Sequence, residues 1–114
     1  NISLIGPGAT ADAANFAENS AIKLRRGTKA IFTNVYLSKW KVGVDMEHDE
    51  TLVFVGNALK LSNVTFNEIG SPFKGKNTAG NSVDVAAGIT QGTSTGAGAG
   101  AGIPSWASTW AIGF

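Results

Sequence analysis

Residues 32–37 read Phe-Thr-Asn-Val-Tyr-Leu, and residues 61–66 read Leu-Ser-Asn-Val-Thr-Phe. The first four residues of the chain, Asn-Ile-Ser-Leu, match the second half of the same pattern. In each copy an asparagine precedes a β-branched residue, a polar or aromatic residue, and a large apolar residue. Asn34 follows Asn1 by 33 residues, and Asn63 follows Asn34 by 29. This spacing is too long for a hairpin and is typical of repeat architectures, so we predict the coils of a β-solenoid.

Short β-favouring runs surround these copies, and no long helical pattern separates them. They cover residues 1–5, 21–25, 30–40, 42–46, 51–55, 58–61 and 64–69. Two runs have nearly the same wording, Ala-Ile-Lys-Leu at 21–24 and Ala-Leu-Lys-Leu at 58–61. This likeness favours an all-β parallel β-helix over the alternative fold, a β-sandwich. The repeated Asn is expected at a bend, where it tolerates left-handed backbone and forms hydrogen bonds along the stack.

The composition changes after Gly70. We therefore assign residues 1–70 to β-solenoid coils and residues 71–102, rich in Gly, Ala, Ser and Thr, to a loop or linker. Residues 103–114 contain two of the three tryptophans. We predict that this aromatic C-terminal segment caps the open end of the solenoid and protects its strand edges.

The composition as a whole is that of a β-rich extracellular protein. The chain has 114 residues, of which 43% are hydrophobic and only 15% charged, with a net charge of +1 and no cysteine. One domain with a modest core fits this length. The charge gives no reason to expect nucleic acid as a partner, and no apolar run is long enough to predict a membrane-spanning helix. Because the chain begins inside a repeat unit, we expect it to be a piece of a longer protein.

The sequence resembles a group of surface or secreted β-helix proteins of Bacteroidota. The resemblance rests on Asn-Ile-Ser-Leu-Ile-Gly at 1–6, Leu-Arg-Arg-Gly-Thr at 24–28, the strand at 31–37 and the Trp-rich end. It covers about two thirds of the chain, but the Gly-Ala alternation at 96–102 departs from the group. The resemblance implies the C-terminal portion of an exported protein, often a lipoprotein, on the cell surface or outer membrane. It assigns no catalytic residue.

Acidic side chains are concentrated in one place, at residues 45–50. Asp45, Glu47 and Asp49 are candidate ligands for a metal, and their carboxylate oxygens suit Ca²⁺. The glycine and bidentate glutamate of an EF-type loop are not recognisable here, so a solvated turn between strands is the simpler interpretation. His48 is the only histidine, which excludes a site built from several histidines of this sequence. No other cofactor is expected.

Three aromatic residues, Tyr36, Trp40 and Phe73, are candidates for stacking on sugar rings. Packing into the core or the cap is the competing interpretation of each. Four charged residues are candidates for a shared catalytic face, although solvent-facing charges on strands are ordinary. They are Lys23, Arg25, Lys60 and Glu68.

The function that we expect is non-enzymatic binding or assembly at the cell surface or outside the cell. The expected partners are the rest of a parent chain or a protein of a surface complex, and a glycan as ligand; an accessory role in outer-membrane uptake would fit. Two alternatives stay open. One is the C-terminal part of a β-helix polysaccharide lyase or hydrolase whose active site lies in other coils, and the other is an adhesin-like stalk.

Overall fold

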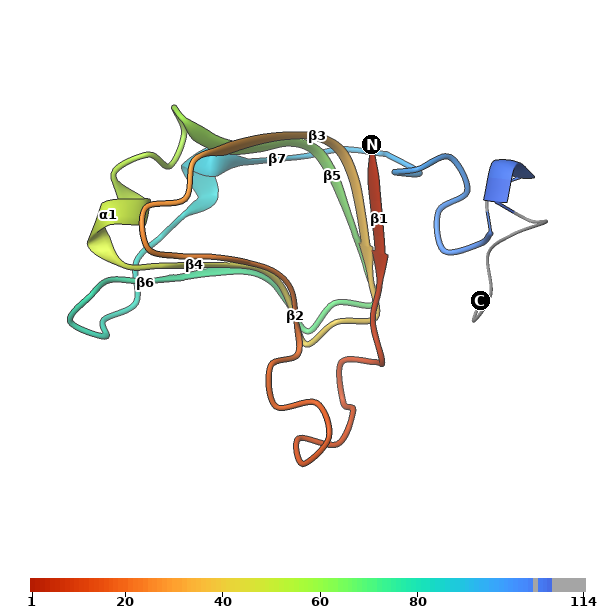
Figure 1. Ribbon diagram of the computed structural model, residues 1–114, viewed down its shortest axis with the longest axis horizontal. Coiled ribbons are helices and arrows are strands. Elements are labelled where there is room, and N and C mark those ends of the chain that lie inside the picture. The colour runs from red at the N-terminus through yellow and green to blue at the C-terminus, as the bar shows by residue number, and fades with distance from the viewer. Residues whose placement is uncertain (104, 108–114) are drawn as a thin grey trace.

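The computed structural model of the chain describes residues 1–103 and 105–107. Its strands wind around one axis, which Figure 1 shows end-on, and pair in parallel throughout. One sheet has the order β1 (Ile2–Ile5), β3 (Ala30–Ser38), β5 (Leu59–Asn67), β7 (Ile89–Gln91). The other has the order β2 (Ser20–Leu24), β4 (Val42–Glu47), β6 (Ser71–Lys76). The predicted parallel β-helix is therefore confirmed.

The Asn repeat forms the corner of each coil. Val35 pairs with Ile2 on one side and with Val64 on the other, so the three Asn residues before them are stacked. Asn34 and Asn63 have φ values of 58° and 55°, and the strands that contain them, β3 and β5, are bent (Figure 1). The Asn63 side-chain amide donates to Asn34 Oδ1 at 2.7 Å, and that of Asn34 donates to Asn1 Oδ1 at 2.9 Å. The expected bend and ladder are both present.

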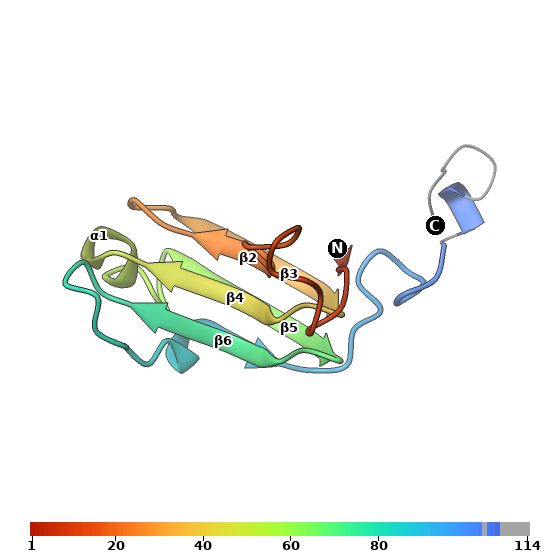
Figure 2. The ribbon, with the colours of Figure 1, turned by 90° about the horizontal axis from the view of Figure 1, so that it is seen from below.

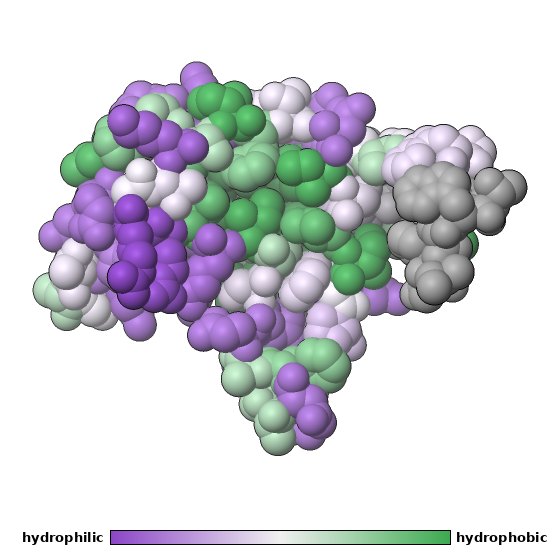
Figure 3. Space-filling model, viewed as in Figure 1, coloured by the Kyte–Doolittle hydropathy of each residue, from purple (hydrophilic) through white to green (hydrophobic). Residues whose placement is uncertain are grey.

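The core lies between the two sheets. Alternate residues of each strand point inward, so that Val44 and Met46 of β4 meet Leu37 and Leu61 of the other sheet in one buried cluster. Figure 2 shows the coils stacked on one another, and Figure 3 shows apolar side chains gathered in the middle of the end face. Inward alternation also fixes which residues of β2, β4 and β6 face outward.

One expected strand is a helical turn. Residues 51–55 were predicted to be extended, but α1 (Asp49–Leu52) occupies the first part of this run. Backbone amides of Thr51 and Leu52 donate to the His48 carbonyl, and Thr51 is buried. The apolar side chains of this run therefore pack the helical turn against the core and do not form a strand.

Two strands lie in the stretch that the sequence assigned to a linker. β6 and β7 fall within residues 71–102, with the 3₁₀ turn η1 (Ala86–Gly88) directly before β7. The two similar runs at 21–24 and 58–61 are not stacked, because the first lies in β2 and the second in β5 of the other sheet. The similarity of these two runs therefore does not arise from stacking, although the fold that it was taken to indicate is correct.

Residues 92–101, which we call the strap, leave β7 and cross the stack of coils toward the N-terminus (Figures 1 and 2). After them η2 (Ser105–Ala107) is the last described element, and Trp106 is 61% exposed. Most of the predicted aromatic cap, at 104 and 108–114, lies outside the described residues.

Candidate functional site

A row of opposite charges crosses the outer face of the β2-β4-β6 sheet. Asp45 of β4 pairs in register with Lys23 of β2 and with Lys74 of β6. Glu47 pairs in the same way with Lys76. Because Val44 and Met46 point into the core, these side chains must point outward and stand side by side.

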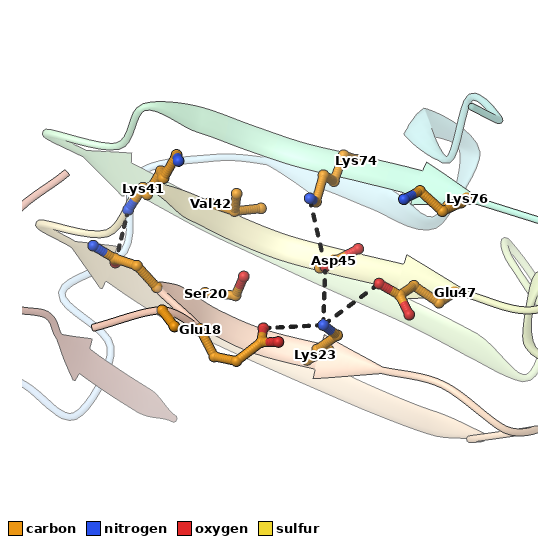
Figure 4. A pocket seen from close by; sticks show the side chains of 11 residues that line it. Glu18, Ser20, Lys23, Lys41, Val42, Asp45, Glu47, Lys74 and Lys76 are labelled. Atoms are coloured by element: carbon orange, nitrogen blue, oxygen red, sulfur yellow. Dashed lines mark hydrogen bonds and ion pairs between the residues drawn. The ribbon is translucent and has the colours of Figure 1, made fainter. Parts of the chain in front are cut away.

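The row lies in a groove of about 280 Å³, which Figure 4 shows from close by. The loop that precedes β2 forms one wall, and β2, β4 and β6 form the floor. Its charged lining consists of four lysines and three carboxylates: Lys23, Lys41, Lys74, Lys76, Glu18, Asp45 and Glu47. Asn19 holds the loop wall in place, because it donates to the Gly8 carbonyl and accepts from the Lys41 amide.

Lys23 is surrounded by carboxylates. Its ammonium lies 3.1 Å from Glu18, 3.5 Å from Glu47 and 3.8 Å from Asp45. The hydrogen bond to Glu18 is the main reason that the pKa of Lys23 lies above its ordinary value; burial opposes the rise, and the three negative charges add to it. The charge of Lys23 is thus largely neutralised within the protein.

Asp45 is the most enclosed charged group of the groove, since its side chain is only 2% exposed. Its Oδ2 lies 3.8 Å from both Lys23 and Lys74, and its buried Oδ1 has no hydrogen-bond partner among the described residues. Burial raises the pKa of Asp45, although the two lysines act in the opposite direction. Burial thus favours the neutral form of this carboxyl more than water would.

The positive charge on the other side of the groove is less engaged. Lys74 is 52% exposed and has Asp45 as its ion-pair partner. Lys41 and Lys76 form no ion pair with any part of the chain that the structure describes. Lys41 and Lys76 can thus meet a ligand directly, and Lys74, half exposed, can do so while it stays beside Asp45.

The predicted metal ligands do not converge. Asp45 and Glu47 face the groove, and neither lies in the expected solvated turn, because both belong to β4. Asp49 instead begins α1, where its carboxylate accepts from the Thr78 amide and its own amide donates to the Thr78 hydroxyl. Within residues 1–103 and 105–107, no group of three or more acidic or His side chains is arranged to hold a metal ion.

The three aromatic candidates lie in different places. Tyr36 faces outward beneath the strap, with its ring 3.8 Å from where a side chain on Gly100 would begin. Trp40 is half-buried and donates to the Leu4 carbonyl at 3.0 Å. Phe73 packs against the core, with its ring centroid 6.4 Å from that of Phe66. They form no common platform.

The suggested catalytic face is also divided. Lys23 ends up in the groove, whereas Lys60 lies on β5 of the other sheet and Glu68 follows that strand. Sequence reasoning missed Lys74 and Lys76 as site residues. The signal was present, because each stands 29 residues after an acidic partner, Asp45 or Glu47, which is the same spacing as that from Asn34 to Asn63.

Residues 1–111 match the family of pectate-lyase-like β-helix domains, and the chain belongs to this family. No curated protein and no solved structure matches the chain. Among the described residues, no helix is of a length and hydropathy to cross a membrane.

Proposed function

We propose that this chain is a carbohydrate-binding β-helix domain of a surface or secreted protein, and that it binds an acidic polysaccharide in the groove over β2, β4 and β6. The observation that carries the proposal is the set of lysines, Lys41, Lys74 and Lys76, around a cavity of about 280 Å³. The family to which the chain belongs is described by its likeness to pectate lyase, and pectate is a polymer of this kind.

The charge distribution favours an acidic sugar over a neutral one. Lys74 and Lys76 point the same way from one strand, and their Cα atoms lie about 7 Å apart because two residues of extended chain separate them. Each can donate a charge-assisted hydrogen bond to a carboxylate of the ligand. Lys23 contributes little, because Glu18, Asp45 and Glu47 already surround it. Binding through exposed ammonium groups should weaken as salt is added.

Titration calorimetry with oligogalacturonate as the probe tests this proposal. The variant Lys74→Ala/Lys76→Ala should lose at least about tenfold in affinity, since each charge-assisted hydrogen bond contributes about 1.5–3 kcal/mol and about 1.4 kcal/mol corresponds to tenfold. The control Lys29→Ala/Lys60→Ala removes the same charge from exposed positions outside the groove and should change affinity by less than about twofold. Absence of binding by the wild type, or equal losses in both variants, would refute the proposal.

An enzymatic role is the second candidate, and the buried Asp45 beside Lys74 favours it. A carboxyl and an ammonium 3.8 Å apart in a groove are the residue types that general acid–base catalysis on a sugar uses. The ultraviolet absorbance of an unsaturated uronate product, compared between the wild type and Asp45→Asn, would detect elimination. A wild type that binds the oligomer without cleaving it leaves binding as the function.

The location and partners are part of the same proposal. A charged fraction of only 15% in a β-rich chain supports a place at the outer surface or outside the cell. We expect the parent protein in the outer-membrane or extracellular fraction, together with the surface complex in which it acts. Recovery from the cytoplasmic fraction alone would contradict this location.

A further inference from the structure

Three hydroxyl-bearing residues form a second outward row, on the sheet opposite the groove. Ser3 of β1 pairs in register with Tyr36 of β3, and Tyr36 pairs with Thr65 of β5. Their neighbours Val35, Leu37 and Val64 belong to the core, so the side chains of this row point outward. The row itself runs across the strands, from one coil to the next. The strap runs along this row from the third coil to the first.

Thr65 holds the beginning of the strap. Its hydroxyl donates to the Gly92 carbonyl at 2.8 Å and accepts from the Ser94 amide at 2.7 Å. The Gly92 amide donates to the Val64 carbonyl at 2.9 Å, which continues the pairing of β7 with β5.

Ser3 holds the other end in the same manner. Its hydroxyl donates to the Thr95 carbonyl at 3.2 Å and accepts from the Ala97 amide at 2.9 Å. Between these contacts Gly96 is buried, with a φ of 63°, and a Cβ added there would lie 2.3 Å from the Ile2 carbonyl oxygen and the Ser3 hydroxyl. The strap therefore has room for no side chain where it passes β1.

We propose that the strap is a clasp that fastens the third coil to the first. β1 has four residues and its only strand partner is β3, so the strap gives β1 a second set of contacts besides that pairing. The clasp supplies four hydrogen bonds through two hydroxyls, and its Gly100 lies beside the Tyr36 ring. When the clasp is released, the pairing with β3 is the main attachment that β1 keeps, so we expect β1 to open more often.

Two glycine substitutions with similar backbone geometry isolate the clasp. Gly96 and Gly100 have φ values of 63° and 56°, so alanine is strained to a similar degree at both. Only at Gly96 would the new methyl collide with β1; at Gly100 its nearest neighbour is the Tyr36 ring at 3.8 Å. We expect Gly96→Ala to speed amide hydrogen exchange of Ile2–Ile5 at least about tenfold, and Gly100→Ala to change it by less than about threefold.

Ser3→Ala provides a milder test if Gly96→Ala does not fold. It removes both hydrogen bonds of one anchor without steric conflict, and we expect exchange in β1 to rise about threefold to thirtyfold. Gly96→Ala/Ser3→Ala should exchange no faster than Gly96→Ala alone, because both changes release one contact. Unchanged exchange of β1 in Gly96→Ala and Ser3→Ala, or an equal effect of Gly100→Ala, would overturn the proposal.

Discussion

At the scale of single residues, the stacked Asn1, Asn34 and Asn63 have two structural roles. Asn34 adopts a left-handed backbone, which most residues disfavour, and its side chain both donates and accepts along the stack. The same residue type thus makes the corner and fixes the register between coils. A slip by one residue would break the ladder and turn the core side chains outward.

Substitutions of Asn34 should separate these two tasks. We expect Asn34→Gly, which keeps the backbone free, to lower the free energy of unfolding by about 1–2 kcal/mol through loss of the ladder. Asn34→Ala should cost about 1 kcal/mol more, because alanine resists positive φ. Urea unfolding followed by circular dichroism measures both. Equal values for the two variants would show that the corner imposes no conformational demand.

The two acids of β4 should have opposite effects on the pH dependence of stability. The pKa of Asp45 in the folded protein is raised above its ordinary 3.8, so its contribution is present below that pH and lost as pH rises through the folded value. Asp45→Asn should therefore gain stability relative to the wild type as pH rises above 3.8. Unfolding titrations at several pH values test this, and a relative loss over that range would contradict the expectation.

Glu47 provides the contrasting case. Burial acts to raise its pKa, but Lys23, Arg25 and His48 outweigh burial and hold the pKa below its ordinary 4.5. Its contribution is present above that pH and lost as pH falls through the folded value. Glu47→Gln should therefore be less stable than the wild type at pH 7 and match it in strong acid. The same titrations, run in parallel, provide the comparison.

At the scale of elements, inward alternation decides which positions matter. Leu61 of β5 is fully buried, whereas Ile31 of β3 is 58% exposed, although both are large aliphatic residues. Leu61→Ala should lower the free energy of unfolding by about 3 kcal/mol, and Ile31→Ala by less than about 0.5 kcal/mol. Thermal and urea unfolding measure the difference. Similar losses of stability in the two variants would contradict the inward position of Leu61 and the outward position of Ile31.

The sequence could predict the coils because their corners use one residue type at a nearly constant spacing. It could not predict β6, whose Pro72, Lys74 and Gly75 disfavour a strand; the edge of β4 supplies hydrogen bonds that outweigh local preference. The run at 51–55 shows the opposite case, because the first part of this β-favouring run forms a helical turn. The groove could not be predicted either, because the contact of Asp45 with Lys74 depends on the register between β4 and β6.

At the scale of the whole molecule, one strand edge is only partly paired among the described residues. β1 covers β3 only from Val35 to Ser38, so no described residue pairs with its first half on that side, where Ile31 is exposed. An unpaired, apolar strand edge promotes association between chains. We expect light scattering of the 114-residue chain to rise with concentration and Ile31→Lys to suppress the rise without changing the melting temperature. Scattering that is the same in both would refute the role of this edge.

The strap has a consequence for the order in which the chain folds. Neighbouring coils join residues 29 to 33 positions apart, whereas the contacts of Ser3 with the strap join residues 92 and 94 positions apart. Closing the longer loop costs more entropy, so the coils should form first and the clasp last. Contacts absent from the transition state slow unfolding and leave the folding rate unchanged. The strap, a stretch of small residues that adds almost nothing to the core, would then govern how long the native coils persist.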